Sequence, residues 1–124
     1  MSITISSKDG KHLHLNAWNW GVIHYLVEKA GLFPEDVWEP ARYLGTDLTT
    51  EQSKQLVDFF ESSVMVHLLP GERMFFDGTK TSAVDDGTLF READEQWKNY
   101  SLHQDVLAKV LQLLRNASGA ISFY

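Results

Sequence analysis

Hydrophobic and polar residues alternate along the chain near both of its ends. The alternation runs through residues 3–5 and 13–15, and the pair Asp9-Gly10 lies between these two segments. A period of two is typical of half-buried strands, and Asp-Gly supplies the positive φ angle that a tight hairpin turn needs. Residues 120–124, with the sequence AISFY, alternate in the same way. These patterns predict an N-terminal hairpin and a C-terminal strand beside it.

Three longer segments have apolar residues spaced three and four positions apart, which is typical of amphipathic helices. We expect these helices at residues 17–30, 50–68 and 102–117. Each segment is bounded by residue types that cap or stop helices. In chain order, these signals are Asn16 and Gly31, Thr49-x-x-Gln52 and Pro70-Gly71, and Ser101-x-x-Gln104 and Ser118-Gly119.

Each predicted helix has one face that we expect to be buried. In chain order, the faces are Trp18, Trp20, Val22, Ile23, Leu26, Val27 and Ala30; Leu56, Phe60, Val64 and His67; and Leu102, Val106, Val110, Leu113, Leu114 and Ala117. The first face is wide, because Trp18 and Trp20 lie about 160° apart at 100° per residue. We therefore expect at least one of these two rings to contact something other than the central core.

The segments between the predicted helices are less regular. Pro34 is expected to open a short helical turn. The region from residue 69 to 100 has a weak pattern, in which we expect short strands at 73–76 and 88–91 and a mobile linker, DGTKTSAVDDG. Candidate core residues after the first helix are Trp38, Tyr43 and Leu44.

These elements together predict an α+β fold made of two layers. Three main helices would cover one face of a small, mostly antiparallel sheet of three or four strands, built from the N-terminal hairpin and the C-terminal strand. A length of 124 residues is close to the commonest size of a single domain, so we expect residues 1–124 to form one domain.

Composition narrows the classes of function. The chain has no cysteine, which excludes disulfides and thiolate metal sites. A net charge of −6 argues against nucleic acid as a partner and suits a basic protein partner. The sequence has no apolar run long enough for a signal peptide or a membrane span, so we expect a cytoplasmic protein. It also has no nucleotide-binding, cofactor or nucleophile motif, so no cofactor is expected.

Four histidines are candidate metal ligands. His12 and His14 lie two residues apart on a predicted strand, so both imidazoles should face the same side and can chelate Zn²⁺ if a third ligand is near. His67 and His103 are placed at helix ends, where they can share a ligand or a proton if those ends meet. The alternatives are solvent-facing histidines on the strand and backbone-bonded histidines at the core edge. We expect His24, beside Trp20, to be a surface residue.

Aromatic and acidic residues form a second set of candidates. Trp18, Trp20 and Tyr25 can border a partner-binding groove, because large rings anchor interfaces. The alternative is that these rings fill the core. Asp77, Asp85 and Asp86 can form an acidic contact patch for a basic partner, and the alternative is a solvated loop. Their spacing is not that of a calcium-binding loop.

Three stretches of the sequence resemble a family of small bacterial proteins that has no assigned function. They are NAWNWGVIHYLVEKAGL, PGERMFFDGTKTSAVDDGTLFREA and NYSLHQDVLAKVLQLLRNASGAISFY. The resemblance spans most of the chain, but it includes no catalytic motif. It implies a bacterial origin and a small fold, and it transfers no functional residues.

The sequence leaves three hypotheses of function. The first is a small cytoplasmic binding protein, such as an immunity-like protein that blocks a toxin through an acidic, aromatic face. The second is a small enzyme or metal-binding protein that uses histidines brought together by folding. The third is a homodimer that forms through a free edge of the strand at residues 120–124.

Overall fold

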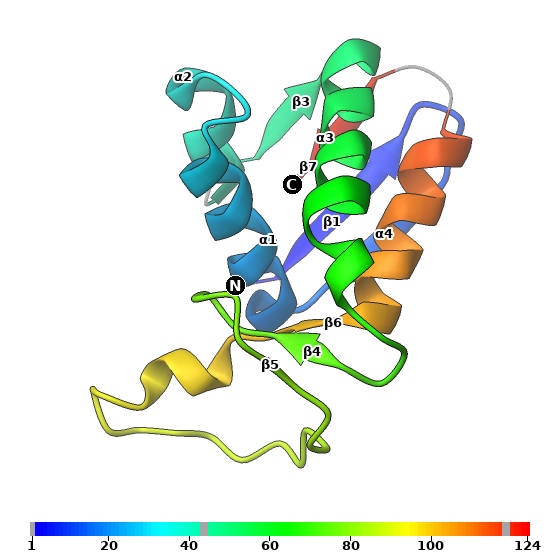
Figure 1. The fold of residues 1–124 in the computed structure, drawn as a ribbon. Coiled ribbons are helices and arrows are strands. Elements are labelled where there is room, and N and C mark those ends of the chain that lie inside the picture. The colour runs from blue at the N-terminus through cyan, green and yellow to red at the C-terminus, as the bar shows by residue number, and fades with distance from the viewer. Residues whose placement is uncertain (1, 43–44, 118–119) are drawn as a thin grey trace.

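The computed structural model describes residues 2–42, 45–117 and 120–124 and has the expected α+β fold, with two antiparallel sheets and helices packed against them (Figure 1). The larger sheet has the strand order β2-β1-β7-β3. Its strands are β1 (Ile3–Ser7), β2 (His12–Leu15), β3 (Thr46–Leu48) and β7 (Ile121–Phe123). The main helices are α1 (Ala17–Ala30), α3 (Thr50–Ser63) and α4 (Gln104–Asn116).

The predicted hairpin and C-terminal strand are confirmed. In the hairpin, Ile3 pairs with Leu15, and Gly10 in the turn has a φ of 90°. Strand β7 pairs with β1 on one side and with β3 on the other. Both edges of β7 are therefore occupied, and the expectation of a free edge at residues 120–124 is wrong. Strand β3 was not predicted, because three residues are too short to show an alternating pattern.

The first two helix starts are confirmed in detail. The Asn16 side chain accepts a hydrogen bond from the backbone N–H of Asn19, at 2.9 Å, and α1 ends at Gly31 in the left-handed conformation, with a φ of 64°. The capping box between Thr49 and Gln52 is formed. Helix α3 ends at Ser63, five residues earlier than expected, and a 3-10 turn, η2 (Met65–His67), follows it.

The expected capping box at Ser101 is wrong. Residues 102 and 103 form a short strand, β6 (Leu102–His103), so α4 begins later, with His103 at its N-cap. Ser101 is buried, and its hydroxyl oxygen accepts a hydrogen bond from Arg73 Nη1, at 3.2 Å. Pairing with a neighbouring strand thus replaces local capping at this position. The predicted stop at Ser118-Gly119 lies outside the described residues.

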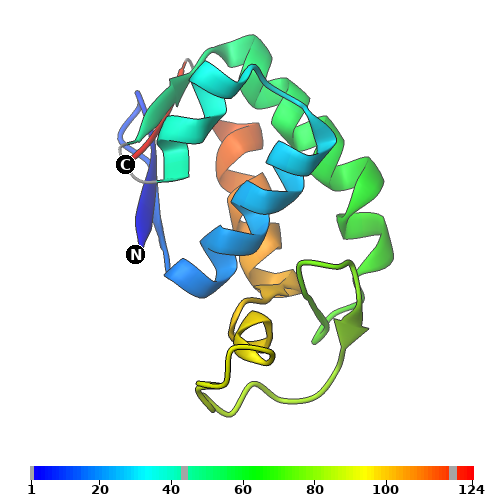
Figure 2. The ribbon, with the colours of Figure 1, turned by 90° about the vertical axis from the view of Figure 1, so that its left-hand side faces the viewer.

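Figures 1 and 2 show α1, α3 and α4 on one face of the larger sheet. The buried residues of the strands and of these helices form a continuous apolar core. Its largest fully buried side chains include Ile5, Ile23, Leu56, Phe60, Leu107, Leu111 and Phe123. On the other face, polar residues such as Ser122 and Asp47 alternate with the core positions, and the Ser122 hydroxyl donates a hydrogen bond to Asp47, at 2.6 Å. The two-layer prediction is confirmed.

Two short helical segments connect α1 to β3. They are α2 (Glu35–Trp38), which follows Pro34 as expected, and the 3-10 turn η1 (Glu39–Arg42). They bring Trp38 into the core, as predicted. The other two candidate core residues of this segment, Tyr43 and Leu44, lie outside the described residues.

The larger sheet and the helices α1, α3 and α4 together form what we call the sheet-and-helix body. The middle segment, residues 69–100, lies below this body in Figure 1. It contributes β4 (Arg73–Met74), β5 (Lys80–Thr81) and the 3-10 turn η3 (Gln96–Asn99). Strands β4 and β5 join β6 in a small sheet with the order β5-β4-β6. The strand predicted at 73–76 is confirmed only for its first half, and the one predicted at 88–91 is wrong, since those residues, all described, form no strand.

No helix within the described ranges combines the length and the apolar character that crossing a bilayer requires.

Candidate functional site

The two tryptophans of helix α1 lie in different surroundings. Trp20 is only 4% exposed, and its ring stacks on Phe123, with centroids 5.6 Å apart. Trp18 is 40% exposed and contacts the ring of Tyr100 edge to face, at 5.0 Å. The expectation that one of these rings would leave the central core is confirmed, and its partner belongs to the middle segment.

Four aromatic side chains that contact one another, called here the row of rings, connect the middle segment to α1. Trp18 contacts Tyr100, Tyr100 contacts Phe76, and Phe76 contacts Tyr25, with centroid distances of 5.0, 5.1 and 5.1 Å. Gly21 permits this contact, because a Cβ atom there would lie 2.8 Å from Cδ1 of Tyr100. Edge-to-face and offset contacts of this kind each contribute about 0.5–1.5 kcal/mol beyond the area that they bury. Trp18 and Tyr25 therefore have partners within this chain.

His24 is buried, and its expected place on the surface is wrong. The ring is 4% exposed and lies parallel to the ring of Trp38, with centroids 5.2 Å apart. Its Nε2 atom lies 3.0 Å from the Trp38 carbonyl oxygen, and Trp38 Nε1 donates to the His24 carbonyl, also at 3.0 Å. The position looked peripheral on α1 because the sequence does not reveal that α2 and η1 cover that side of the helix.

The His24 ring also has a defined proton position. A carbonyl oxygen only accepts hydrogen bonds, so Nε2 of His24 must carry the proton. The second ring nitrogen, Nδ1, then has a lone pair in the neutral imidazole. Among the described residues Nδ1 has no hydrogen-bond partner, so it can accept one from a bound molecule.

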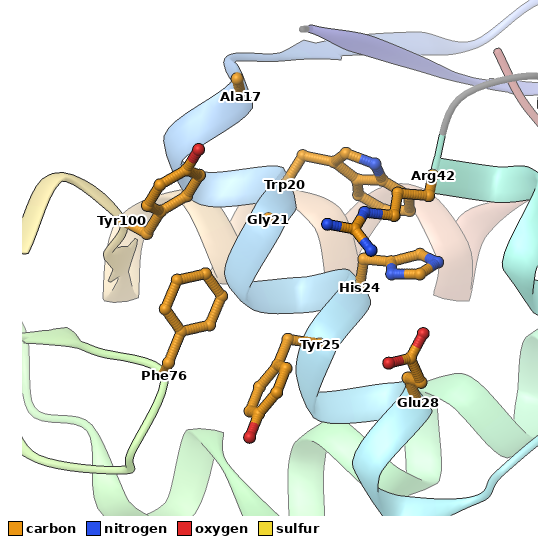
Figure 3. Close-up of a pocket in the computed structure, with 9 residues that line it drawn as sticks. All are labelled: Ala17, Trp20, Gly21, His24, Tyr25, Glu28, Arg42, Phe76 and Tyr100. Atoms are coloured by element: carbon orange, nitrogen blue, oxygen red, sulfur yellow. The ribbon is translucent and has the colours of Figure 1, made fainter. Parts of the chain in front are cut away.

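A cleft of about 480 Å³ lies along α1 between the row of rings and η1 (Figure 3). Its lining includes Gly21 and His24 of α1, Phe76 and Tyr100 of the middle segment, and Arg42 of η1. Figure 3 shows the rings of Phe76 and Tyr100 on one side and Arg42 on the opposite side, with Glu28 below Arg42. The volume lies within the range of small-molecule sites, which are mostly apolar with a few polar groups. Trp20 and Tyr25, two of the three rings predicted to border a groove, also line this cleft, whereas its other walls are far apart along the chain and were not predicted.

An acidic loop, residues 82–95, forms the outer part of the middle segment. It has five acidic residues and one arginine, which gives −4 of the chain's net charge of −6. Asp85 and Asp86 line a hollow of about 360 Å³ together with Trp18. Two of the three predicted aspartates thus lie beside one of the predicted aromatic residues. Asp77 lies elsewhere, in the turn between β4 and β5.

Hydrogen bonds lower the pKa of all three of these carboxyl groups. Asp86 accepts from the hydroxyl and then from the backbone N–H of Thr88, at 2.5 and 3.0 Å, and these bonds lower the pKa of its carboxyl. The hydroxyl and N–H of Thr79 lower the pKa of Asp77 in the same way. For Asp85, the backbone N–H of Gly87 is the main cause of a lowered pKa, followed by the contact with His103. The three side chains are negatively charged at neutral pH.

The candidate metal ligands lie in separate places. His12 and His14 are exposed on the same side of β2, where Nδ1 of His14 lies 3.1 Å from the Thr4 hydroxyl. Nε2 of His103 lies 3.2 Å from an Asp85 carboxylate oxygen. Within the described ranges, no three His, Asp or Glu side chains are grouped as a metal site would require. Metal binding by these histidines stays a prediction.

His67 is exposed, and its expected place on the buried face of the second helix is wrong. Helix α3 ends at Ser63, and the η2 turn then redirects the chain, so His67 no longer follows the stripe of Leu56 and Phe60. Its carbonyl oxygen accepts a hydrogen bond from Lys80, at 2.7 Å. His67 and His103 therefore have different neighbours.

Compared with protein-family models, curated proteins and solved structures, the chain matches none of them. The resemblance of its sequence to a family of small bacterial proteins stays a prediction. The function has to be inferred from the residues of this chain.

Proposed function

We propose that this chain is a non-enzymatic binding protein that contacts a basic partner protein through the acidic loop and Trp18. The observation that carries the proposal is the loop itself. Residues 82–95, all of them described, form neither helix nor strand. Loops of this length without secondary structure are uncommon in compact domains and are often binding elements.

Charge is the first support for a basic partner. The loop concentrates most of the net negative charge of the chain in fourteen residues. Asp85 and Asp86 are both ionised at neutral pH, and hydrogen bonds lower the pKa of each carboxyl further. A concentrated field of one sign attracts a partner of opposite charge and speeds the encounter between them. The interaction should weaken as salt is added, because exposed charges are screened.

Exposed apolar side chains are the second support. Val84 is 85% exposed and Leu89 is 48% exposed, and both line the same hollow as Trp18. Apolar groups that stay in water and are bordered by charges are typical of contact surfaces. Large rings such as that of Trp18 often contribute the largest part of the binding energy at an interface. The carboxylates would form a polar rim around these apolar anchors.

One concrete version of the proposal is an immunity-like protein that covers a basic surface of a toxin. A nuclease or another enzyme that binds anionic substrates presents such a surface, and an acidic loop can occupy it. The bacterial origin and the cytoplasmic location expected from the sequence belong to this version of the proposal.

Affinity capture followed by a binding measurement tests the proposal. The tagged chain is used to capture proteins from lysate of its own source, and each captured protein is purified and titrated at several salt concentrations. The test variant is Asp85→Asn with Asp86→Asn, since asparagine keeps a side-chain oxygen for the turn hydrogen bonds while removing the charge. We expect a basic partner whose binding is weakened about tenfold or more by this change.

The matched control removes two charges elsewhere. Asp36→Asn with Asp58→Asn changes two exposed carboxylates on α2 and α3 and should change affinity by less than about twofold. Trp18→Ala should weaken binding by about tenfold or more, with circular dichroism used to verify folding. An acidic partner, or a partner that binds the loop variant as tightly as the unaltered chain, would contradict the proposal.

A further inference from the structure

The cleft along α1 carries an inference that is independent of the acidic loop. We propose that this cleft binds an α-amino acid with an aromatic side chain, in its zwitterionic form. The proposal rests on three features of the cleft: a flat floor, an aromatic wall, and a pair of opposite charges facing that wall.

The floor of the cleft is a bare stretch of helix. Ala17 and Gly21 are one turn apart on α1, and both line the cleft. Gly21 has no side chain, and the edge of the Tyr100 ring lies against its backbone, so a flat group would lie beside Tyr100 over the neighbouring part of this helix face. The close approach of Tyr100 to Gly21 also sets the position of the wall beside this floor. A planar ring can lie flat against such a floor.

The wall is made of rings that folding brings together. Tyr25, Phe76 and Tyr100 come from α1 and from both sides of the acidic loop, and all three line the cleft. Phe76 contacts both tyrosines at centroid distances of 5.1 Å, which orients all three rings. A ligand ring can add one more edge-to-face or offset contact to this group. The wall therefore favours an aromatic side chain over an aliphatic one.

The opposite side of the cleft bears one positive and one negative group. Arg42 and Glu28 both line the cleft, and Figure 3 places His24 between them. A guanidinium can bind a carboxylate through two parallel N–H donors, and a carboxylate can accept from an ammonium group. An α-amino acid carries both of those charges on neighbouring atoms. A ligand with no net charge also avoids the general repulsion that a chain with a net charge of −6 exerts on anions.

His24 adds a directional acceptor between the two charges. Its Nε2–H is used by the Trp38 carbonyl, so Nδ1 can only accept when the ring is neutral. An ammonium group has three N–H donors, and Glu28 and His24 can take two of them. The pair of hydrogen bonds between His24 and Trp38 fixes the ring in place, so little order has to be gained on binding.

Calorimetry and NMR with defined ligands test this assignment. The probes are L-phenylalanine, L-tyrosine and L-tryptophan, and the comparison ligands are phenethylamine, 3-phenylpropionate and L-alanine. We expect at least one aromatic amino acid to bind and to shift the backbone amide resonance of Gly21. Each comparison ligand lacks the carboxylate, the ammonium or the ring, so each should bind about tenfold more weakly or worse.

Variants separate the cleft from the rest of the surface. Arg42→Gln and Glu28→Gln should each lower the affinity for the aromatic amino acid about tenfold, because each removes one charge-assisted contact. Arg91→Gln and Glu51→Gln, two exposed residues outside the cleft, should leave the affinity unchanged.

Two results would overturn the proposal. One is the absence of both heat and a Gly21 shift with all three aromatic amino acids at about 2 mM, a concentration at which a site of submillimolar affinity would be mostly occupied. The other is equal affinity for the ligands that lack a carboxylate or an ammonium group. Neither result would bear on the basic partner of the acidic loop, because those probes do not test it.

Discussion

The sheet-and-helix body and the middle segment are two parts of one chain that are held together in different ways. In the body, the apolar sides of the strands and helices meet in one continuous buried core. In the middle segment, the strands β4 and β5 are two residues long, and residues 82–89 are all exposed. The difference indicates that burial of apolar surface stabilises the body, whereas contacts at a few points hold the middle segment.

Those points of contact lie at the two ends of the middle segment. Near its start, Phe76 packs in the row of rings on α1. At its end, Tyr100 contacts Trp18 of α1, and in the strand that follows, the His103 N–H donates a hydrogen bond to Asn19 of α1, at 2.9 Å. Within the segment, the side chain of Asn99 forms two hydrogen bonds with the backbone of Phe90, each 2.8 Å long. Residues 82–89 of the acidic loop lie between these points and are exposed, so they are not part of the buried core. A segment held only at its ends can change its contacts with little loss of stability in the body.

The largest contrast should appear when one apolar side chain is truncated in each part. Phe60→Ala removes a fully buried ring from the body and should lower the free energy of unfolding by about 3–5 kcal/mol. Val84→Ala, in the acidic loop, should change it by no more than about 0.5 kcal/mol. Urea unfolding of both variants checks this. A large loss from Val84→Ala would show that the loop belongs to the cooperative core.

A smaller loss is expected at the histidine that joins α1 to α2. His24→Leu removes the buried hydrogen bond to the Trp38 carbonyl and the stacking of the imidazole on the Trp38 ring, which should cost about 1–3 kcal/mol. The matched control is His12→Leu on the exposed side of β2, where about 0.5 kcal/mol or less is expected. Equal losses from the two substitutions, measured by chemical unfolding, would contradict the buried role of His24.

The contact between the body and the middle segment can be tested at Gly21 of α1. Gly21→Ala places a Cβ atom against Tyr100, which Trp18 and Phe76 hold in position. We expect a net loss of about 1–2 kcal/mol in unfolding free energy, since crowding exceeds the gain in helix propensity. In a chain that already carries Tyr100→Leu, the same substitution should be neutral or stabilising. A loss that persists in that background would assign the cost to something other than Tyr100.

The smallest effect concerns pH and should remain within the acidic loop. The pKa of Asp85 and the pKa of Asp86 are lowered on folding, so the turn hydrogen bonds are fully present above about pH 4 and are lost as the pH falls through the lowered values. NMR titration of the Gly87 and Thr88 amides should give midpoints below the ordinary value of 3.8. Asp85→Asn should abolish the transition at Gly87. Midpoints at or above 3.8 would contradict the hydrogen-bonded turns.

Most elements of the body could be predicted from the sequence, whereas most of the structure in and beside the middle segment could not. The hairpin, the C-terminal strand and the starts of α1 and α3 could be predicted, because local patterns and capping residues determine them. The start of α4 could not, because pairing of residues 102–103 with β4 replaced the cap that Ser101 offered. The ordered turns of the acidic loop lack periodicity, so only its composition was visible in the sequence.

The candidate sites divide in a similar way. Asp85, Asp86 and Trp18 were identified from residue type, and the fold brings them to one hollow. His24 and Arg42 were missed as parts of a site, because their positions depend on α2 and η1 packing beside α1. A buried histidine at the edge of a helical face gives no signal of its own in a single sequence. Glu28 and Phe76 likewise could not be identified as site residues from the sequence, because only folding brings them to the same cleft.

Hydrogen–deuterium exchange with and without the captured basic partner tests the central claim most directly. In the free chain, amides of β1 and β7 should exchange only through global unfolding, while those of residues 82–95 should exchange fast. Addition of the partner should slow exchange in residues 82–95 and at the start of α1, where Trp18 lies, and leave the rest of the body unchanged. Protection that appears on another surface and leaves residues 82–95 unprotected would contradict the assignment of the acidic loop as the contact site.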